Sequence, residues 1–173
     1  MSDKATLFTF WRSSCSWRVR IAINLAGVDV EQVPVDLNTD GQLSEEYRKV
    51  NPMGQVPAFK TGNFILTQSV AIMEYIHDLY PEVGLLPENP LDKAKVRMVT
   101  ELICSGIQPL QNTKVREMHS KDKKEELNWS KYWITAGFHA LEQLLAEVAG
   151  ECCVGDRVTI ADCCLVPQVD DKL

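Results

Sequence analysis

Hydroxyls, a thiol and arginines are crowded into residues 11–20, where a predicted strand gives way to a predicted helix. Ser13, Ser14, Cys15 and Ser16 stand at the start of that helix, whose unpaired amides and partial positive charge favour an anion such as a thiolate. This segment can either activate the thiol of Cys15 or stabilise a thiolate that a ligand brings. In an alternative without chemistry, one serine caps the helix and Cys15 packs in the core.

Two further segments of the sequence are suited to bind an extended or anionic ligand. Val56 precedes Pro57 ahead of a predicted strand, and a proline there is often cis in small α/β modules, which exposes the preceding amide and carbonyl to an extended peptide. Gln68 and Ser69 begin a predicted helix and offer amides and a hydroxyl to a carboxylate, although a plain helix cap explains them equally well. Three such segments in one small module indicate a ligand-binding site more strongly than any single one.

The strands and helices that should position these segments alternate along the first part of the chain. The first helix carries Trp17, Ile21 and Leu25 at intervals of four residues and ends near Gly27, and a turn at residues 61–63 joins two strands in a hairpin. The order β-α-β-α-β-β-α predicts an α/β module with a mixed sheet. The predicted strands are residues 5–10, 30–35, 56–60 and 64–66, and the predicted helices are 15–28, 44–50 and 69–79.

Beyond a linker punctuated by prolines at residues 81–90, the sequence is helical. Apolar residues recur at steps of three and four through residues 96–110, and more strongly through 127–148. Gly106 and Pro109 fall inside the first of these patterns, and a proline in a helix interior removes a backbone hydrogen bond and clashes with the preceding turn. We therefore expect a kink there.

A capping-box pattern predicts one more helix near the C-terminal end. The Thr159 hydroxyl should accept from the amide of Asp162, whose carboxylate should reach back, so that the helix begins at Ile160. Pro167 should limit this helix to about two turns. The predicted domains are an α/β module at residues 1–84 and a helical domain at 89–173.

Length, charge and cysteine usage narrow the classes of function. The 173 residues suffice for one domain or two small ones, and a net charge of −6 without a basic stripe argues against a nucleic-acid partner. No apolar run is long enough for a membrane span and no secretory signal is visible, so we expect a cytoplasmic protein without a membrane partner. The six cysteines include no C-x-x-C pair and the three histidines are far apart. This favours apolar packing in a reducing compartment over a soft-metal site at the doublets Cys152-Cys153 and Cys163-Cys164, and we expect no metal.

Four motifs together resemble one protein family. The chain is similar to the zeta-class glutathione transferases, the maleylacetoacetate isomerases, in the string Ser13-Ser14-Cys15-Ser16-Trp17-Arg18-Val19-Arg20 and in residues 51–57, 68–69 and 106–112. The segments 153–156 and 161–169 fit the same pattern, so the resemblance extends from about residue 5 to Val169. It implies a thioredoxin-like N-terminal domain, a helical C-terminal domain, and glutathione as cosubstrate.

The resemblance also implies roles for particular residues. Ser13 would be the hydroxyl that stabilises the glutathione thiolate, with Ser14 as second choice and Cys15 assisting. The backbone of Val56 would bond the cysteinyl part of glutathione, the helix start at Gln68 would take the γ-glutamyl carboxylate, and the helical domain would close the pocket. The implied glutathione-binding residues are Ser13, Ser14, Cys15, Ser16, Trp17, Arg18, Gln42, Val56, Gln68, Ser69, Gln108 and Asn112.

The implied reaction is the cis–trans isomerisation of maleylacetoacetate, a small acidic substrate, to fumarylacetoacetate in tyrosine and phenylalanine breakdown. The same thiolate would displace halide from small α-halo acids, and the family's quaternary structure implies a homodimer. Family members continue past the Pro-Gln-Val segment at 167–169 with further helices and an arginine for the substrate carboxylate. The resemblance thus implies a C-terminally truncated chain. Arg12 or Arg18 can partly replace that cation, although the scaffold of the loop explains both arginines better.

Two alternatives from other classes stay open. One is a non-catalytic glutathione-binding or interaction protein, which a truncation would favour. The other is a thiol oxidoreductase that uses Cys15, although the missing C-x-x-C pair argues against it.

Overall fold

The computed structural model describes residues 4–170, which form two compact units that divide between Leu85 and Leu86. Buried apolar side chains are distributed over both units. Within the described residues, none of the helices combines the length and the apolar character that a membrane span requires.

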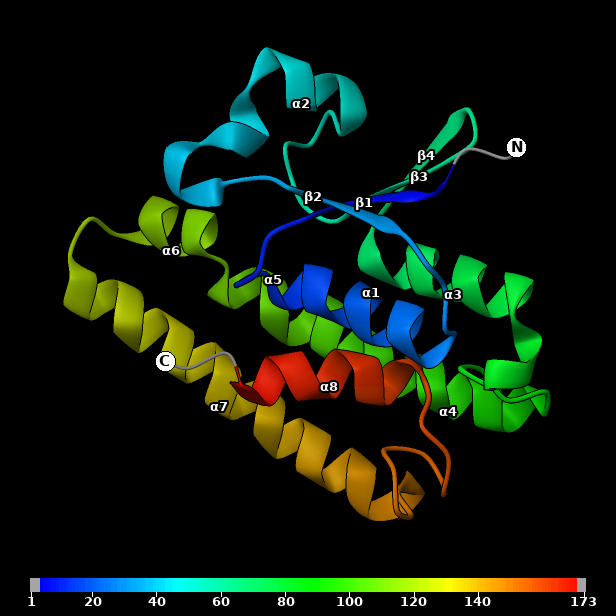
Figure 1. The fold of residues 1–173 in the computed structure, drawn as a ribbon. Helices are drawn as coiled ribbons and strands as arrows, with labels where there is room; N and C mark the ends of the chain where they lie inside the picture. The colour runs from blue at the N-terminus through cyan, green and yellow to red at the C-terminus, as the bar shows by residue number, and fades with distance from the viewer. Residues whose placement is uncertain (1–3, 171–173) are drawn as a thin grey trace. The chain divides into compact units, whose positions relative to one another are not determined.

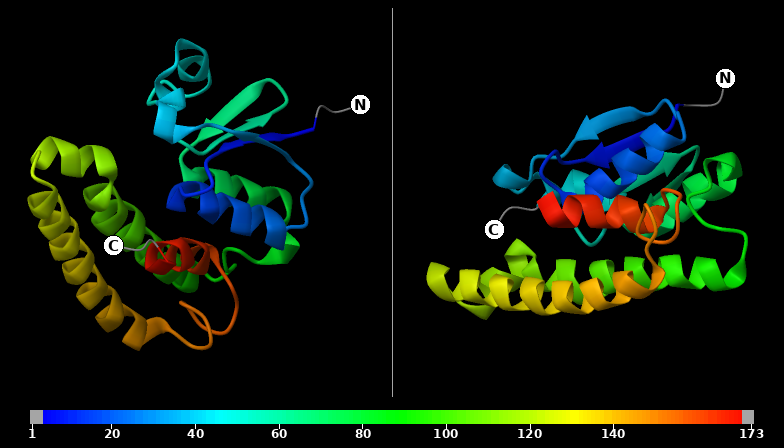
Figure 2. Two further views of the ribbon diagram at one scale, coloured as in Figure 1. Left: turned by 60° about the vertical axis from the view of Figure 1, so that its left-hand side comes forward. Right: turned by 90° about the horizontal axis from the view of Figure 1, so that it is seen from below.

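The first unit is built on a four-stranded mixed sheet. Its strands are β1 (Thr6–Thr9), β2 (Glu31–Pro34), β3 (Ala58–Thr61) and β4 (Phe64–Thr67). Its helices are α1 (Ser14–Leu25), α2 (Glu45–Val50) and α3 (Ser69–Leu79), with short turns η1 (Leu37–Thr39), η2 (Gly41–Leu43) and η3 (Pro81–Val83). In the order β2-β1-β3-β4, β1 is parallel to β2 and antiparallel to β3, which pairs antiparallel with β4. Because α1 and α3 lie side by side on one face of the sheet and α2 lies on the other (Figure 1, Figure 2), the unit is thioredoxin-like and the predicted fold class is confirmed.

The buried face of α1 differs from the predicted stripe. Val19, Ala22 and Ile23 are almost fully buried, whereas Leu25, one of the apolar residues of the predicted helical pattern, is 45% exposed. α1 packs closely against α3, and close packing selects buried side chains by fit and not by size alone. The helix also ends earlier than predicted, because Gly27 adopts a left-handed φ of 62°.

The predicted hairpin is present, with different strand ends. β3 begins at Ala58 and not at residue 56, because Pro57 has no amide hydrogen to give to the ladder. Gly62 supplies the left-handed φ of 54° that the turn requires, and β4 extends to Thr67.

The second unit consists of helices and loops. Its elements are α4 (Pro90–Glu101), the π-helical turn η4 (Leu102–Ile107), α5 (Gln108–Gln111), α6 (Thr113–His119), α7 (Lys123–Val148) and α8 (Ile160–Asp170). The regular α-helix is interrupted where the kink was predicted, because the backbone widens into η4 just before Pro109, which cannot donate the next helical bond. α7 packs so closely on η4 that a Cβ on Gly137 would collide with the side chain of Ile107.

The capping box at the start of α8 is present with one changed bond. Oδ2 of Asp162 accepts from the amide of Thr159 at 2.8 Å and from its hydroxyl at 3.0 Å, so the predicted reach-back is confirmed. The Thr159 oxygen accepts from the amide of Ala161 at 3.3 Å and not, as predicted, from that of Asp162. The helix begins at Ile160 as predicted, but the limit of two turns is wrong. α8 continues through Pro167, since packing on α4 and η4 offsets the single lost backbone bond.

Candidate active site

The sheet topology brings the three predicted ligand-binding segments of the first unit to one end of the sheet. β1 ends there, the antiparallel β3 starts there, and β4, antiparallel to β3, also ends there (Figure 1). The register pairs Ala58 with Phe8 on one side and with Thr67 on the other. The helix starts at Ser13 and Gln68 and the segment before β3 therefore meet at the same end of the sheet.

Ser13 is the N-cap of α1. Its Oγ accepts from the amide of Ser16 at 3.1 Å, and its hydroxyl hydrogen is not used within residues 4–170. The amide of Ser14 likewise has no hydrogen-bond partner in that part of the chain. Because one hydroxyl can accept from the helix and donate to a sulfur, the capping role and the thiolate-stabilising role of Ser13 are compatible. Ser14 and Ser16 are buried, and Cys15 is half-buried and not disulfide-bonded.

Arg20 fixes the loop that leads to Ser13. Its Nη1 donates to Oγ1 of Thr9 at 2.8 Å and to the carbonyl of Phe10 at 3.2 Å, and its Nη2 donates to the carbonyl of Trp11 at 3.1 Å. Partial burial lowers the pKa of Arg20, yet a guanidinium remains charged at neutral pH. Sequence reasoning did not single out this residue, because its partners include backbone carbonyls that only the folded loop presents.

The segment before β3 offers an unpaired peptide group. The Val56–Pro57 bond is cis, and neither the amide nor the carbonyl of Val56 bonds to any residue between 4 and 170. The hydroxyl of Tyr47 and the side-chain amide of Asn51 both donate to the carbonyl of Gln55, at 2.9 and 2.7 Å, and hold the segment in place. Burial raises the pKa of Tyr47 to about 12, so this donor stays protonated at neutral pH. Neither donor was predicted, because nothing in their spacing specifies that they converge on one carbonyl.

Gln68 has a backbone conformation that few L residues adopt, with φ 71° and ψ 117°. Its side chain is exposed and makes no hydrogen bond within the described residues. The next residue, Ser69, is buried and begins α3, and its Oγ accepts from Nη1 of Arg18 at 3.3 Å, which links the starts of α1 and α3. A strained residue at a helix start with free amides is a reason to expect a bound anion.

Gln42 lies beside the bend that leads to the Val56 segment. A Cβ on Gly54 would come within 2.9 Å of the Gln42 carbonyl oxygen. The Gln42 side chain is buried, and its Nε2 donates to Oδ1 of Asp40 at 3.2 Å. Its Oε1 has no hydrogen-bond partner in the part of the chain that the structure describes, so one polar atom remains for a ligand or a water.

The other predicted residues are placed as follows. Trp17 is half-buried on α1. Gln108 begins α5 in the second unit, and Asn112 caps α6 there, where its Oδ1 accepts from the amide of Lys114 at 3.2 Å.

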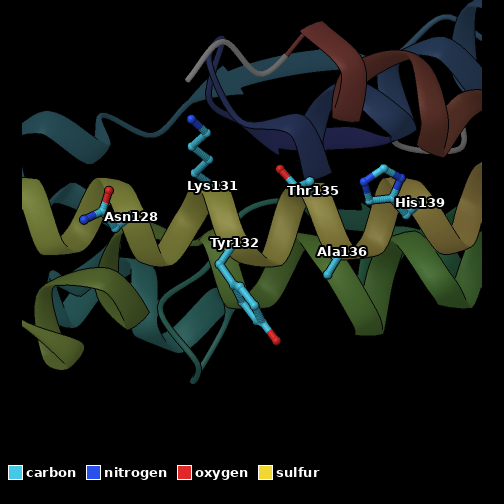
Figure 3. A pocket seen from close by; sticks show the side chains of 6 residues that line it. All are labelled: Asn128, Lys131, Tyr132, Thr135, Ala136 and His139. Atoms are coloured by element: carbon cyan, nitrogen blue, oxygen red, sulfur yellow. The ribbon is translucent and has the colours of Figure 1, made fainter.

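An open hollow of about 460 Å³ lies along α7 in the second unit (Figure 3). It contains none of the predicted site residues, and is lined by Asn128, Lys131, Tyr132, Thr135, Ala136 and His139. Among residues 4–170, no group of three or more His, Cys, Asp or Glu is arranged to hold a metal ion.

Comparison with known proteins identifies the family. The model of the glutathione S-transferase N-terminal domain matches residues 3–78. Maleylacetoacetate isomerase from Mus musculus is 50% identical over 170 residues, which cover 97% of this chain and 78% of the mouse protein. The chain belongs to the maleylacetoacetate isomerase family, the zeta class of glutathione transferases.

Solved zeta-class structures have the same fold. A holo structure of a bacterial maleyl pyruvate isomerase of this class superposes with a TM-score of 0.90 at 38% identity, and the match covers 95% of this chain and 81% of that one. A maleylacetoacetate isomerase from Anaeromyxobacter dehalogenans, with dicarboxyethyl glutathione and citrate bound in its active site, gives a TM-score of 0.85 at 36% identity over 96% of this chain and 79% of that one. The resemblance and the thioredoxin-like plus helical fold that it implied are thereby confirmed.

Proposed function

We propose that this protein is a glutathione-dependent isomerase that converts maleylacetoacetate to fumarylacetoacetate. The proposal rests on the positions of Ser13, Val56 and Gln68 at the same end of the sheet. The chain is also 50% identical in sequence to a maleylacetoacetate isomerase over 170 residues. The dicarboxyethyl glutathione held by one structural neighbour further supports a small diacid substrate. Displacement of halide from small α-halo acids belongs to the same proposal, because it uses the same thiolate.

The unpaired hydrogen-bonding groups of the three segments in the first unit match the groups of glutathione. The unpaired amide and carbonyl of Val56 can pair with the extended cysteinyl backbone of the tripeptide. The free amides at the start of α3, with Gln68 and the Ser69 hydroxyl, match the γ-glutamyl carboxylate. Gln42 has one carboxamide oxygen left for the ligand. The glutathione-binding roles of Gln108 and Asn112 rest on the motif at residues 106–112 alone.

The residues at the start of α1 would keep the sulfur ionised. When bound, glutathione supplies a thiolate that adds to the cis double bond, permits rotation and is then eliminated. The Ser13 hydroxyl donates to that sulfur while its oxygen accepts from the helix, and the amide of Ser14 adds a second donor. Cys15 assists at the edge of this site, and Ser16, Trp17, Arg18 and Arg20 hold the loop and the helix start. Arg12, exposed and stacked over the Trp11 ring at 5.7 Å, is a candidate cation for the acidic substrate.

An isomerase assay on the full chain tests this function. Maleylacetoacetate should be converted to fumarylacetoacetate only when glutathione is present, and glutathione should raise the unfolding temperature in a saturable manner. A saturable thermal shift without turnover would instead show a non-catalytic glutathione-binding protein. Turnover that is equal with and without glutathione would contradict the proposed mechanism.

The Gln68→Gly substitution should change stability and binding in opposite directions. Glycine adopts a φ of 71° without strain, so the free energy of unfolding should rise by about 1 kcal/mol. Loss of the carboxamide should weaken glutathione binding about tenfold, as expected for one hydrogen bond to a charged group. Urea unfolding and isothermal titration measure the two effects. Gln68→Asn is the matched control, because it keeps a carboxamide and tolerates the left-handed region, and unchanged affinity in Gln68→Gly would exclude Gln68 from the site.

Domain roles, cellular context and assembly complete the proposal. We assign glutathione binding to the domain at residues 1–84, and residues 89–173 form the helical domain of the proposal. The family supports a homodimer that acts in tyrosine and phenylalanine breakdown. The six cysteines, which form no disulfide, support a reducing compartment such as the cytoplasm.

A further inference from the structure

Two thiols meet in the second unit, and neither belongs to the proposed glutathione site. Cys104 lies in η4 and Cys164 in α8, 60 residues apart in the sequence, and their Sγ atoms are 3.6 Å from each other. Cys164 is fully buried and Cys104 is half-buried. Neither forms a disulfide in the reduced chain described here.

The packing of α8 against the η4–α5 segment holds these two sulfur atoms next to each other. One helical turn beyond Cys164, Nε2 of the buried Gln168 donates to Oε1 of Gln111 in α5 at 2.9 Å. α8 thus contacts the η4–α5 segment at two successive points, one with two sulfurs and one with two carboxamides. A disulfide has a bond length of about 2.0 Å, so the sulfur atoms, now 3.6 Å apart, need to approach by only about 1.6 Å.

We propose that Cys104 and Cys164 form a reversible disulfide when the protein meets a hydroperoxide. Cys104 is the thiol that meets the oxidant, because it is the more exposed of the two, and a hydroperoxide is small enough to reach a half-buried sulfur. Cys164 is the resolving thiol. The inference goes beyond the proposed isomerase activity and does not depend on it.

The chemistry balances with hydrogen peroxide as the oxidant. The Cys104 thiolate attacks one peroxide oxygen, the O–O bond breaks, and water leaves after protonation, so that Cys104 becomes a sulfenic acid. The Cys164 sulfur then attacks the Cys104 sulfur, an S–S bond forms, the S–O bond breaks, and a second water leaves with the Cys164 proton. The two sulfurs lose two electrons in total and the peroxide gains them. A dithiol reductant reverses the change by thiol–disulfide exchange and is itself oxidised.

Peptide mapping of the full chain tests the proposal directly. After treatment with hydrogen peroxide, alkylation and trypsin digestion, the peptide of residues 98–114 should be linked to that of residues 158–172. The linked pair should weigh two hydrogen atoms less than the sum of the two peptides, and it should disappear after reduction with dithiothreitol. Fragmentation of the linked pair should place the bond on Cys164 and not on the adjacent Cys163.

Three variants sharpen the assignment. Cys104→Ala and Cys164→Ala should abolish the link, whereas Cys163→Ala should retain it as the matched control in the same helix. Oxidised wild type should also unfold at a higher temperature than reduced wild type, because the bond closes a long loop in the unfolded chain. The proposal is overturned if peroxide oxidises other cysteines of the wild type without forming this link, or if the link persists in Cys164→Ala. Because the wild type alone can give the first result, a variant that fails to fold does not prevent a decision.

Discussion

Replacing Ser13 by alanine should lower the isomerase turnover number roughly 100- to 1,000-fold and weaken glutathione binding far less. The Ser13 oxygen accepts from the amide of Ser16, and the hydroxyl hydrogen remains for the glutathione sulfur. A preorganised donor stabilises the negative charge of the thiolate, and its loss is felt in the chemical step. The contacts proposed for Val56 and Gln68, which bind the rest of the tripeptide, are not touched by the substitution.

Two readouts distinguish this effect from a general loss of structure. Ser13→Ala also removes the N-cap of α1, which should lower the free energy of unfolding by about 1 kcal/mol. Asp122→Ala is the matched control, because it removes the N-cap of α7, where the carboxylate accepts from the amide of Lys124 at 2.7 Å. It should cost similar stability without affecting turnover. Ser13→Thr keeps a capping hydroxyl and should keep most of the activity.

The pKa of the bound glutathione thiol gives the second readout. A pH titration of thiolate absorbance in the complex should show a higher thiol pKa in Ser13→Ala than in wild type, because a donor to the charged form has been lost. Turnover and thiol pKa that both stay at wild-type values would remove Ser13 from the mechanism. Ser14→Ala would then be the next variant to measure.

The helix starts could be predicted from the sequence because their signals are local. Ser13, Gln68 and the Thr159 capping box each stand immediately before a helix. The helices after Gln68 and Thr159 begin where predicted, and α1 begins one residue earlier than predicted. The buried side of α1 could not be predicted, because it depends on which residues α3 admits and not on the size of Leu25. For the same reason, nothing local predicts that α8 continues past Pro167.

In the candidate site too, local features could be predicted and tertiary contacts could not. Its three ligand-binding segments could be predicted because Ser13, Val56 and Gln68 are each adjacent to a turn or helix start with a recognisable residue pattern. The donors that hold these segments, Arg20 and Asn51, bond to backbone carbonyls that only the folded chain presents. The binding roles stay predictions, and the variants of Ser13 and Gln68 test them.

Asp162→Ala should produce the largest loss of stability, about 3 kcal/mol, with a fall in unfolding temperature of roughly 10 °C. The Asp162 carboxylate accepts from the amide and the hydroxyl of Thr159 through Oδ2, and from the amide of Cys153 through Oδ1 at 2.8 Å. One side chain therefore caps α8 and fastens the preceding loop. Alanine would leave the two backbone amides without an acceptor in a partly buried setting, and each lost partner costs about 1–3 kcal/mol.

A thiol probe and a neighbouring aspartate make this prediction specific. Burial and, next, a hydrogen bond to Asp162 raise the pKa of Cys153, so its thiol should react faster with a maleimide in Asp162→Ala than in wild type. Asp156→Ala is the matched control, because Asp156 accepts a single exposed bond from the amide of Glu151 at 3.1 Å and should cost less than about 1 kcal/mol. Asp162→Asn keeps one acceptor oxygen and should fall between the two. Equal stability losses in Asp162→Ala and Asp156→Ala would contradict the prediction, because the cost would then not follow the number of amides that each carboxylate holds.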